Sequence, residues 1–508
     1  MIRKVLVANR GEIAVRVLRA CREMGIRTVA VYSEADRANL HVQMADEAVA
    51  IGPPPAVESY LSMDRLLEAA HRTKCQAIHP GYGFLAENAS FARRCEQEKI
   101  TFVGPNSRAL ELVGDKIRAR QTMEKAGVPI IPGMKSASKK LEEFIEAGRR
   151  IGYPVIVKAS AGGGGKGMRI VREEKDLAPA LDAGRREAAS AFGDETVYLE
   201  RYIEEPRHVE FQVLCDDAGN IVHLFERECS IQRRHQKLVE ETPSTALDPE
   251  LRNRMGETAK KVMRAAGYTN AGTVEFLLDK SGSFYFLEVN ARLQVEHPIT
   301  ELVTGVDLVR QQILIASGEQ LPFTQNDMRQ RGHALECRIY AEDPSNNFLP
   351  SPGKILFLKE PSGPGVRLDS GIYGGWEVPI YYDPILAKLI VWAETRELSC
   401  KRMAAALEDY AVLGIRTTIP FLRDIVRHPE FAAGRTTTAF IGQHFDGWRE
   451  DTEDPEARHA VLAVAALSEM QQKRPGARGA HGAVRSDEPS PWQSLGGWQI
   501  GRTESHGV

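Results

Sequence analysis

A glycine-rich loop over residues 158–169, KASAGGGGKGMR, has a composition that suits phosphate binding. Four consecutive glycines begin at Gly162, and backbone without Cβ atoms can adopt positive φ and close over phosphate oxygens. Lys158 and Lys166 would offset the phosphate charge. The loop lacks the GKS or GKT of a Walker motif and opens no helix as a dinucleotide-binding turn does. It predicts a nucleotide clamp of another kind, with a flexible hairpin loop as the alternative.

Two carboxylates on neighbouring predicted strands suit a hard metal ion. Glu275 lies in TVEFLLD, and Glu288 follows the apolar run FYFL, with Asn290 on the same strand face. Oxygen ligands of this kind hold Mg²⁺ between nucleotide phosphates, whereas a buried acidic pair without a metal would repel. The pattern predicts a metal site, and a solvated edge strand is the alternative.

The next few residues could bind a small anion. Arg292, Gln294 and Glu296 alternate with apolar residues, so extended backbone would place all three side chains on one side. A cation, an amide and a carboxylate together could hold an anion and remove its proton. His297 is either a fourth member of this group or a structural residue.

A dense positive cluster lies within ERECSIQRRHQKLVEETPS, residues 226–244. Such a run is usually a solvated face or a nucleic-acid patch. The chain carries 66 basic and 69 acidic residues, and its net charge of -3 argues against nucleic acid as a partner. A phosphate-handling loop fits better, formed by Gln232, Arg233, Arg234, His235 and Lys237.

The elements that must position these groups change character along the chain. Short apolar strands alternate with amphipathic helices through the first hundred residues, which predicts a parallel, doubly wound sheet. Antiparallel hairpins follow, as in 208–227 and 273–289, and indicate a mixed, antiparallel-rich domain. The predicted fold class is therefore α/β with several domains. The predicted domains are an N-terminal domain 1–129, a lid 130–204, a central metal-site domain 205–332, a C-terminal domain 333–446, and a helix with a disordered tail 447–508.

Other features exclude some classes of protein. The apolar run at the N-terminus is too short for a secretory segment or a membrane span, so we expect a cytoplasmic protein that does not contact a membrane. The seven cysteines form no CxxC pair and are odd in number, which favours reduced thiols over disulfides or a zinc site.

Over residues 1–446 the sequence closely resembles the biotin carboxylase subunits of acetyl-CoA, propionyl-CoA and related carboxylases. The motifs stand in that family's order: NRGEIAVR, HPGYGFLAEN at 79–88, GDK at 114–116, the glycine loop, ERECSIQRRHQK, EVNARLQVEHPITE, ECRIYAEDP and FLPSPGKI. The resemblance implies an ATP-grasp fold, in which a doubly wound N-terminal domain and a mobile lid accompany the domain with the metal site.

The resemblance also implies roles, residue by residue. It places ATP at Lys116, Lys158, Gly164, Gly165, Glu200, Arg201, Ile203, His208, Gln232, His235, Glu275, Leu277 and Glu288. Glu275, Glu288 and Asn290 match the ligands of two Mg²⁺ or Mn²⁺ ions. Bicarbonate would bind Lys237, Arg292, Gln294 and Val295, and biotin would meet Tyr82 and Arg338. Glu296 would be the general base, and Arg292, Arg338 and Lys237 the other catalytic residues.

The implied activity is ATP- and bicarbonate-dependent carboxylation of biotin through carboxyphosphate, as the first half-reaction of malonyl-CoA or methylmalonyl-CoA formation. No Met-Lys-Met biotin attachment turn occurs in the chain, so biotin would arrive on a separate biotin carboxyl carrier protein. Carboxyltransferase subunits and a second copy of the chain are the other implied partners. Trp492 and Trp498 in the tail could anchor one of them, and a disordered leftover is the alternative.

The sequence departs from the family pattern at two places, and two other functions remain as alternatives. Arg201 stands where lysine is common, and one extra residue lies in the turn between Glu275 and Glu288. The other functions are an ATP-grasp ligase that joins a carboxylate to an amine, and a catalytically inactive nucleotide-binding regulator. Neither would require Glu296 together with Arg338.

Overall fold

A computed structural model describes residues 1–134, 140–159 and 168–451 of the chain. The chain divides into two units, Met1–Arg449 and Glu450–Val508, and nearly all described residues belong to the first. Gly164, Gly165 and Lys166 of the glycine loop lie outside the described residues. So do residues 452–508 of the predicted helix and tail, with the two tail tryptophans.

The first hundred residues form a parallel sheet with strand order β3-β2-β1-β4-β5. Val5 and Val7 pack with apolar residues of helix α1 (Gly11–Glu23) on one face, while Leu6 packs with residues of α3 (Met63–Arg72) on the other. The predicted doubly wound sheet is confirmed. Its strands are β1 (Lys4–Val7), β2 (Arg27–Tyr32), β3 (Glu47–Ala50), β4 (Ala77–His79) and β5 (Thr101–Phe102), and its further helices are α2 (Leu40–Met44), α4 (Ala89–Gln97), α5 (Ser107–Gly114) and α6 (Lys116–Lys125).

A small three-stranded antiparallel sheet follows, with order β7-β6-β8. Two helices supply Phe144, Ala147, Leu177 and Leu181 to its own apolar core, which is separate from the cores of the larger sheets. The glycine loop therefore connects neighbouring strands of a small, separately packed sheet. Its role as a lid stays a prediction. These elements are α7 (Leu141–Ile151), β6 (Val155–Ala159), β7 (Arg169–Val171), α8 (Leu177–Phe192) and β8 (Val197–Arg201).

The largest sheet has eight strands in the order β13-β12-β9-β10-β11-β14-β21-β19. It continues without interruption past residue 333, so strands from the predicted central and C-terminal domains share one sheet. The predicted hairpins are confirmed, although β10 runs on to Arg233. The strands are β9 (Arg207–Cys215), β10 (Ile221–Arg233), β11 (Gln236–Thr242), β12 (Asn270–Leu278), β13 (Phe284–Asn290), β14 (His333–Tyr340), β19 (Val366–Ser370) and β21 (Ile385–Ala393).

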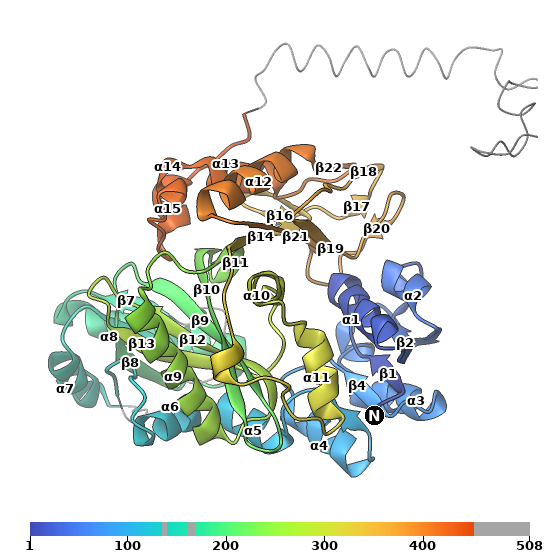
Figure 1. Ribbon diagram of the computed structural model, residues 1–508. Coiled ribbons are helices and arrows are strands. Elements are labelled where there is room, and N and C mark those ends of the chain that lie inside the picture. The colour runs from blue at the N-terminus through green and yellow to red at the C-terminus, as the bar shows by residue number, and fades with distance from the viewer. Residues whose placement is uncertain (135–139, 160–167, 452–508) are drawn as a thin grey trace, which may run out of the picture. The chain divides into compact units, whose positions relative to one another are not determined.

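Helix α9 (Pro249–Ala266) covers one face of this sheet at β9 and β10 (Figure 1). Its start follows the local sequence, because the Asp248 side chain accepts a hydrogen bond from the Leu251 amide and proline occupies the first turn. Gly267 ends the helix with φ +58°, a conformation that glycine adopts without strain.

Alternation along the central strands separates an apolar face from a polar one. Phe211 on β9 and Phe276 on β12 point toward α9 and belong to its core. Glu210 and Glu275 immediately precede these phenylalanines and therefore project from the opposite face, as does His208, two residues before Glu210. The strand pattern thus places the predicted metal ligands on the side of the sheet away from α9.

The remaining elements complete the unit. Helix α10 (His297–Thr304) contacts β14, β21 and β11, and α12 packs on β21 and β14. The others are α11 (Leu308–Ala316), α12 (Arg396–Asp409), α13 (Ile419–Arg427), α14 (Pro429–Ala432), α15 (Phe440–His444) and the short strands β15 (Glu342–Asp343), β16 (Leu349–Pro350), β17 (Gly353–Lys354), β18 (Phe357–Lys359), β20 (Glu377–Val378) and β22 (Ala411–Leu413).

Two expectations from composition can be compared with the described residues. All seven cysteines are buried and free, as expected for reduced thiols. In the part of the chain that the structure describes, no helix combines the length and apolar character needed to cross a membrane.

Replacing Phe276 should weaken the core that supports Glu275. Its fully buried ring makes edge contacts with Phe211 and Phe284. We expect Phe276→Ala to lower the free energy of unfolding by about 3–5 kcal/mol, measured from the urea unfolding midpoint by circular dichroism. The matched control is Phe357→Ala, because the Phe357 ring is half exposed and its loss should change the midpoint little. Equal effects of the two variants would contradict the assignment of Phe276 to the core.

Candidate active site

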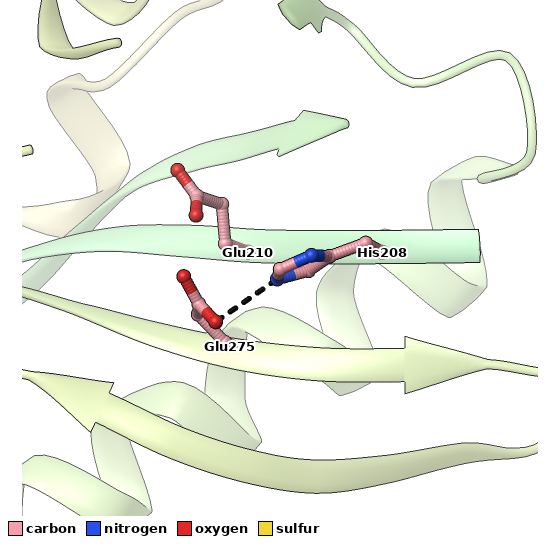
Figure 2. A group of neighbouring side chains, drawn as sticks. All are labelled: His208, Glu210 and Glu275. Atoms are coloured by element: carbon pink, nitrogen blue, oxygen red, sulfur yellow. Dashed lines mark ion pairs between the residues drawn. The ribbon is translucent and has the colours of Figure 1, made fainter. Parts of the chain in front are cut away.

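Three polar side chains mark the centre of the face opposite α9. Figure 2 shows His208 and Glu210 on β9 and Glu275 on β12 pointing to the same side of the sheet. His208 Nε2 lies 3.0 Å from Glu275 Oε2, and one ligand atom from each residue falls within 4.8 Å of the others. All three side chains are buried, so the charges of the two carboxylates must be balanced by neighbours.

A cavity of about 770 Å³ opens over this face. Its walls come from the central sheet and from the lid strands β6 and β8, a place suited to a small substrate. Seventeen of the predicted site residues line it: Lys116, Lys158, Glu200, Arg201, Ile203, His208, Gln232, His235, Lys237, Glu275, Leu277, Glu288, Asn290, Arg292, Gln294, Val295 and Arg338.

The predicted metal ligands occupy neighbouring strands. Glu275 and Glu288 are directly paired across β12 and β13, and Asn290 follows on the same face of β13. Burial and the Glu275 charge raise the pKa of Glu288, whose nearest cation, Lys116 Nζ, is 3.8 Å away. Among the described residues, the only ion pair of Glu288 is this long and partly exposed one, which leaves room for a divalent cation. Arg292 Nη2 donates to Asn290 Oδ1 at 3.0 Å, so this oxygen is shared.

The ammonium of Lys237 binds three carboxylates at once. Its Nζ donates to Glu210 Oε2 at 2.6 Å, to Glu275 Oε1 at 2.8 Å and to Glu296 Oε1 at 2.7 Å. Burial opposes the charge on Lys237, yet the Cys229 thiol and the carboxylates hold its pKa well above the usual value. This single cation therefore neutralises much of the acidic centre.

Glu296 lies beneath the cavity and is fully buried. Its Oε2 accepts from Arg338 Nη2 at 2.9 Å, while Lys237 holds Oε1. Against the effect of burial, Lys237, Arg338 and Arg227 keep the pKa of Glu296 well below its usual value, so the carboxylate is ionised at neutral pH. It can accept a proton, and both of its oxygens are held in place.

The expectation that residues 292–296 form an extended strand is wrong. Strand β13 ends at Asn290, and the following residues turn into α10, with Glu296 at the N-cap position. The side chains converge through hydrogen bonds instead of alternation. Arg292 Nη1 donates to Gln294 Oε1 at 2.7 Å, and Gln294 Nε2 donates to Glu275 Oε1 at 3.3 Å.

His297 does not join this group. Its ring is fully buried, and its Nδ1 lies 2.8 Å from the carbonyl oxygen of Gln294.

The predicted phosphate-handling loop is a tight β-hairpin: β10 and β11 meet at Arg234 and His235, both with positive φ. Arg233 stacks on Phe348 with its guanidinium 4.0 Å from the ring centroid, so that side chain is structural.

Two arginines at the site depend on carboxylates that the sequence did not single out. Arg338 Nε donates to Glu240 Oε1 at 2.5 Å, and Arg292 Nε donates to Glu87 Oε2 at 2.9 Å. Burial raises the pKa of Glu240 to about 7, against the opposing effect of Arg338. Glu87 lies in HPGYGFLAEN, so the motif was noticed although this contact could not be foreseen.

The lid side of the cavity carries a second ion cluster. Lys158 Nζ donates to Glu200 Oε2 at 2.7 Å, and Arg120 holds the other carboxylate oxygen of Glu200. Lys158 is itself mostly buried, so this cation faces the cavity in a fixed direction. Glu210 and Arg120 were both missed, because neither residue lies in a stretch whose spacing suggested a site.

Tyr82 and Glu296 are predicted site residues that do not line the cavity. The Tyr82 hydroxyl donates to Glu12, and its ring centroid lies 6.0 Å from Lys388 Nζ. The placement of Tyr82 in a biotin site stays a prediction.

Comparisons with known proteins agree with this geometry. Three family models match in succession: "Biotin carboxylase, N-terminal domain" at residues 1–110, "Carbamoyl-phosphate synthase L chain, ATP binding domain" at 115–324, and "Biotin carboxylase C-terminal domain" at 336–443. The chain is 54% identical over 442 residues to biotin carboxylase 1 of Bacillus subtilis, covering 87% of this chain and 98% of that protein. It is 55% identical over 447 residues to a pyruvate carboxylase subunit of Methanothermobacter thermautotrophicus, covering 88% and 91%.

Solved structures give the same result. The Campylobacter jejuni biotin carboxylase, in complex with β-γ-ATP, has a TM-score of 0.85 at 47% identity, covering 87% of this chain and 99% of that one. The biotin carboxylase domain dimer of Hydrogenobacter thermophilus 2-oxoglutarate carboxylase, with MgADP, ADP and bicarbonate, has a TM-score of 0.84 at 49% identity, covering 88% and 99%. By these matches, the chain belongs to the biotin carboxylase family of ATP-grasp ligases.

Proposed function

We propose that this biotin carboxylase performs the first half-reaction of an acyl-CoA carboxylase, with biotin presented by a separate carrier protein. The observation that carries the proposal is the Glu296 carboxylate, ionised and held between Lys237 and Arg338 beneath a cavity that also contains an acidic pair. A nucleotide-binding regulator would have no use for such a base. A carboxylate-amine ligase would share the nucleotide residues without needing Arg338.

ATP is proposed to occupy the lid side of the cavity, and bicarbonate the end nearest Glu296. The family structures contain β-γ-ATP in one case and MgADP with bicarbonate in another, which supports this choice of ligands. The proposed nucleotide residues are Lys116, Lys158, Gly164, Gly165, Glu200, Arg201, Ile203, His208, Gln232, His235, Glu275, Leu277 and Glu288. Lys116 and Lys158 would attract the phosphates, while Ile203 and Leu277 offer apolar contact to the base.

The acidic pair fits a divalent cation, since Glu288 repels Glu275 and, among the described residues, pairs only with Lys116 at 3.8 Å. Glu275, Glu288 and Asn290 would hold Mg²⁺ or Mn²⁺, which supplies charge neutralisation for the transferring phosphoryl group. The group of His208, Glu210 and Glu275 is a weaker candidate, because the Lys237 ammonium already lies between two of its carboxylates.

Bicarbonate is a weak electrophile and must be activated by phosphorylation, and we assign the proton removal that starts this step to Glu296. Lys237, Arg292, Gln294 and Val295 would hold the anion, and Glu296 would take its proton. The deprotonated oxygen attacks the γ-phosphorus of ATP, the bond from that phosphorus to the bridging oxygen breaks, and ADP leaves. The products are carboxyphosphate and ADP, and the lid would exclude water from this labile species.

Carboxylation of biotin follows on the same side of the sheet. Carboxyphosphate breaks into carbon dioxide and phosphate, and the phosphate takes the proton from the biotin ureido nitrogen, which then attacks carbon dioxide. Arg338 would stabilise the negative charge on the ureido oxygen, and Tyr82 is proposed to contact the bicyclic ring. Glu240 keeps the Arg338 guanidinium in place.

The proposed partners are the biotin carboxyl carrier protein, carboxyltransferase subunits and a second copy of the chain. Relatives are named for different acceptors, among them propionyl-CoA and methylcrotonoyl-CoA carboxylases as well as pyruvate carboxylase. An acyl-CoA acceptor is the proposal here, and the domain ranges 1–129, 130–204, 205–332 and 333–446 are proposed units of the enzyme.

The central experiment measures ADP release by the purified chain with Mg²⁺ and bicarbonate, with and without free biotin, while carboxybiotin is trapped. The proposal expects biotin to stimulate ADP release and carboxybiotin to form. Hydrolysis that ignores both bicarbonate and biotin would instead indicate a different ATP-grasp ligase.

Glu296→Gln should remove the proposed base while keeping the shape of the side chain. We expect bicarbonate-dependent ATP turnover to fall by at least about a hundredfold, the scale of losing general base catalysis. ATP affinity, measured by equilibrium binding of a fluorescent ATP analogue, should be unchanged. Glu226→Gln is the control, because Glu226 is equally buried but pairs with Arg252 outside the cavity. Turnover at the native rate in Glu296→Gln would exclude this role.

Arg338→Ala should damage biotin carboxylation more than ATP binding. Loss of the guanidinium removes charge stabilisation at the ureido oxygen, and we expect carboxybiotin formation to fall about a hundredfold. The control is Arg396→Ala, an arginine paired with Glu241 away from the cavity. If free biotin is carboxylated equally fast by Arg338→Ala and native enzyme, another residue must stabilise the ureido oxygen.

Glu288→Gln should raise the Mg²⁺ concentration required for activity. A neutral amide is a weaker ligand than a carboxylate, and we expect the half-saturating Mg²⁺ concentration to rise about tenfold. It is measured by titrating Mg²⁺ at fixed ATP. Glu111→Gln, on the exposed surface, is the control. An unchanged Mg²⁺ requirement would remove Glu288 from the metal site.

A further inference from the structure

The backbone between β13 and α10 is held from its buried side by two residues that the proposed mechanism does not use. Lys388 on β21 and His297 at the start of α10 are both fully buried. Each binds one main-chain carbonyl of the segment that carries Gln294, Val295 and Glu296. These contacts fix the backbone next to the cavity.

Lys388 binds the carbonyl of Val295. Its Nζ donates to that oxygen at 3.0 Å and lies 3.2 Å from Glu12 Oε2 and 3.8 Å from Asp369 Oδ2. The two carboxylates balance the buried ammonium, which would otherwise be costly. A fully buried lysine is rare, and a methionine of similar length would pack there without a charge. The hydrogen bond to Val295 gives the charge a specific use.

His297 binds the carbonyl of Gln294. A carbonyl oxygen only accepts hydrogen bonds, so the contact of 2.8 Å fixes the proton on Nδ1. Burial, together with the charges of Lys388, Arg16 and Arg367, lowers the pKa of His297 far below its usual value. The ring is therefore a neutral donor in one tautomer.

These two side-chain contacts set the direction of the Val295 amide together with the backbone N–H of His297, which donates to the same Gln294 oxygen at 3.3 Å. The Gln294 carbonyl and the Val295 N–H belong to one planar trans peptide group, in which they point in opposite directions. His297 holds the carbonyl toward the buried side, so the N–H points toward the cavity that Val295 lines. The Lys388 contact fixes the peptide group on the other side of the Val295 Cα. Among the described residues, no acceptor is recorded for this N–H.

We propose that Lys388 and His297 are positioning residues for the small anion. They hold the carbonyls of Val295 and Gln294, so that the Val295 N–H is presented to bicarbonate. The inference rests on the proposed placement of bicarbonate at Arg292, Gln294 and Val295. It adds a rigid main-chain donor to those side chains. Neither Lys388 nor His297 touches the anion itself.

The test measures KM for bicarbonate and KM for ATP in the bicarbonate-dependent ATPase reaction of the full chain. His297→Leu removes the side-chain donor at similar volume and leaves only the longer backbone contact of residue 297 to the Gln294 carbonyl, 3.3 Å. We expect KM for bicarbonate to rise about tenfold, the scale of losing one hydrogen bond to a charged group. KM for ATP should stay within about twofold, since the nucleotide residues are untouched. His297→Asn keeps an N–H donor near the position of Nδ1 and should restore much of the bicarbonate affinity.

Lys388 gives a second, independent comparison. Lys388→Met alone leaves Glu12 without its cation, whereas Asp369 keeps its ion pair with Arg367. The double variant Lys388→Met with Glu12→Gln therefore keeps the buried charge closer to balance. It should raise KM for bicarbonate in the same way as His297→Leu. If His297→Leu does not fold, this double variant supplies the comparison.

The control is His333→Leu, a buried histidine that pairs with Glu241 and does not contact residues 294–296. It should lower the thermal midpoint without changing either KM. An unchanged KM for bicarbonate in folded His297→Leu or in the Lys388 double variant would overturn the proposal. So would an equal rise of both KM values, which would indicate general distortion. Failure of the proposed function is distinguishable, because native enzyme would then show no bicarbonate-dependent ATP hydrolysis.

Discussion

The site depends on one buried ammonium that three carboxylates share. Glu210, Glu275 and Glu296 come from different parts of the chain and would repel one another without Lys237. Removing one partner from such a buried group leaves uncompensated charge, so the arrangement is strongly coupled. Because Lys237 binds the carboxylates assigned to metal binding and to proton removal, the two functions are held at a fixed separation by a single side chain.

The large sheet makes this arrangement possible by keeping its two faces chemically distinct. Phe211 and Phe276 bury one face against α9, while Glu210 and Glu275, their neighbours in sequence, face the cavity. A shift of one residue in strand register would exchange the two sets. The apolar packing therefore fixes the position of the charges, and the cost of burying those charges is met by ion pairs within the polar face.

Sequence reasoning succeeded where the evidence is local and periodic. Alternating strands and helices identified the doubly wound sheet, and the strand around Glu288 was correctly linked with Glu275. It failed where contacts join distant segments: Glu87 meets Arg292 across more than two hundred residues, and Glu240 meets Arg338. The extended backbone expected at 292–296 was also wrong, because the chain turns there into α10, whose N-cap residue is Glu296.

The same buried charges that stabilise the site also limit its reactivity. Glu296 is held by two cations, which keeps it ionised but makes it a weaker base than a free carboxylate. Bicarbonate bound at its proposed site would compete for Lys237 and release part of that hold. Proton removal would then become easier when the substrate is present, because Glu296, the proposed base, regains basicity as Lys237 turns toward the anion.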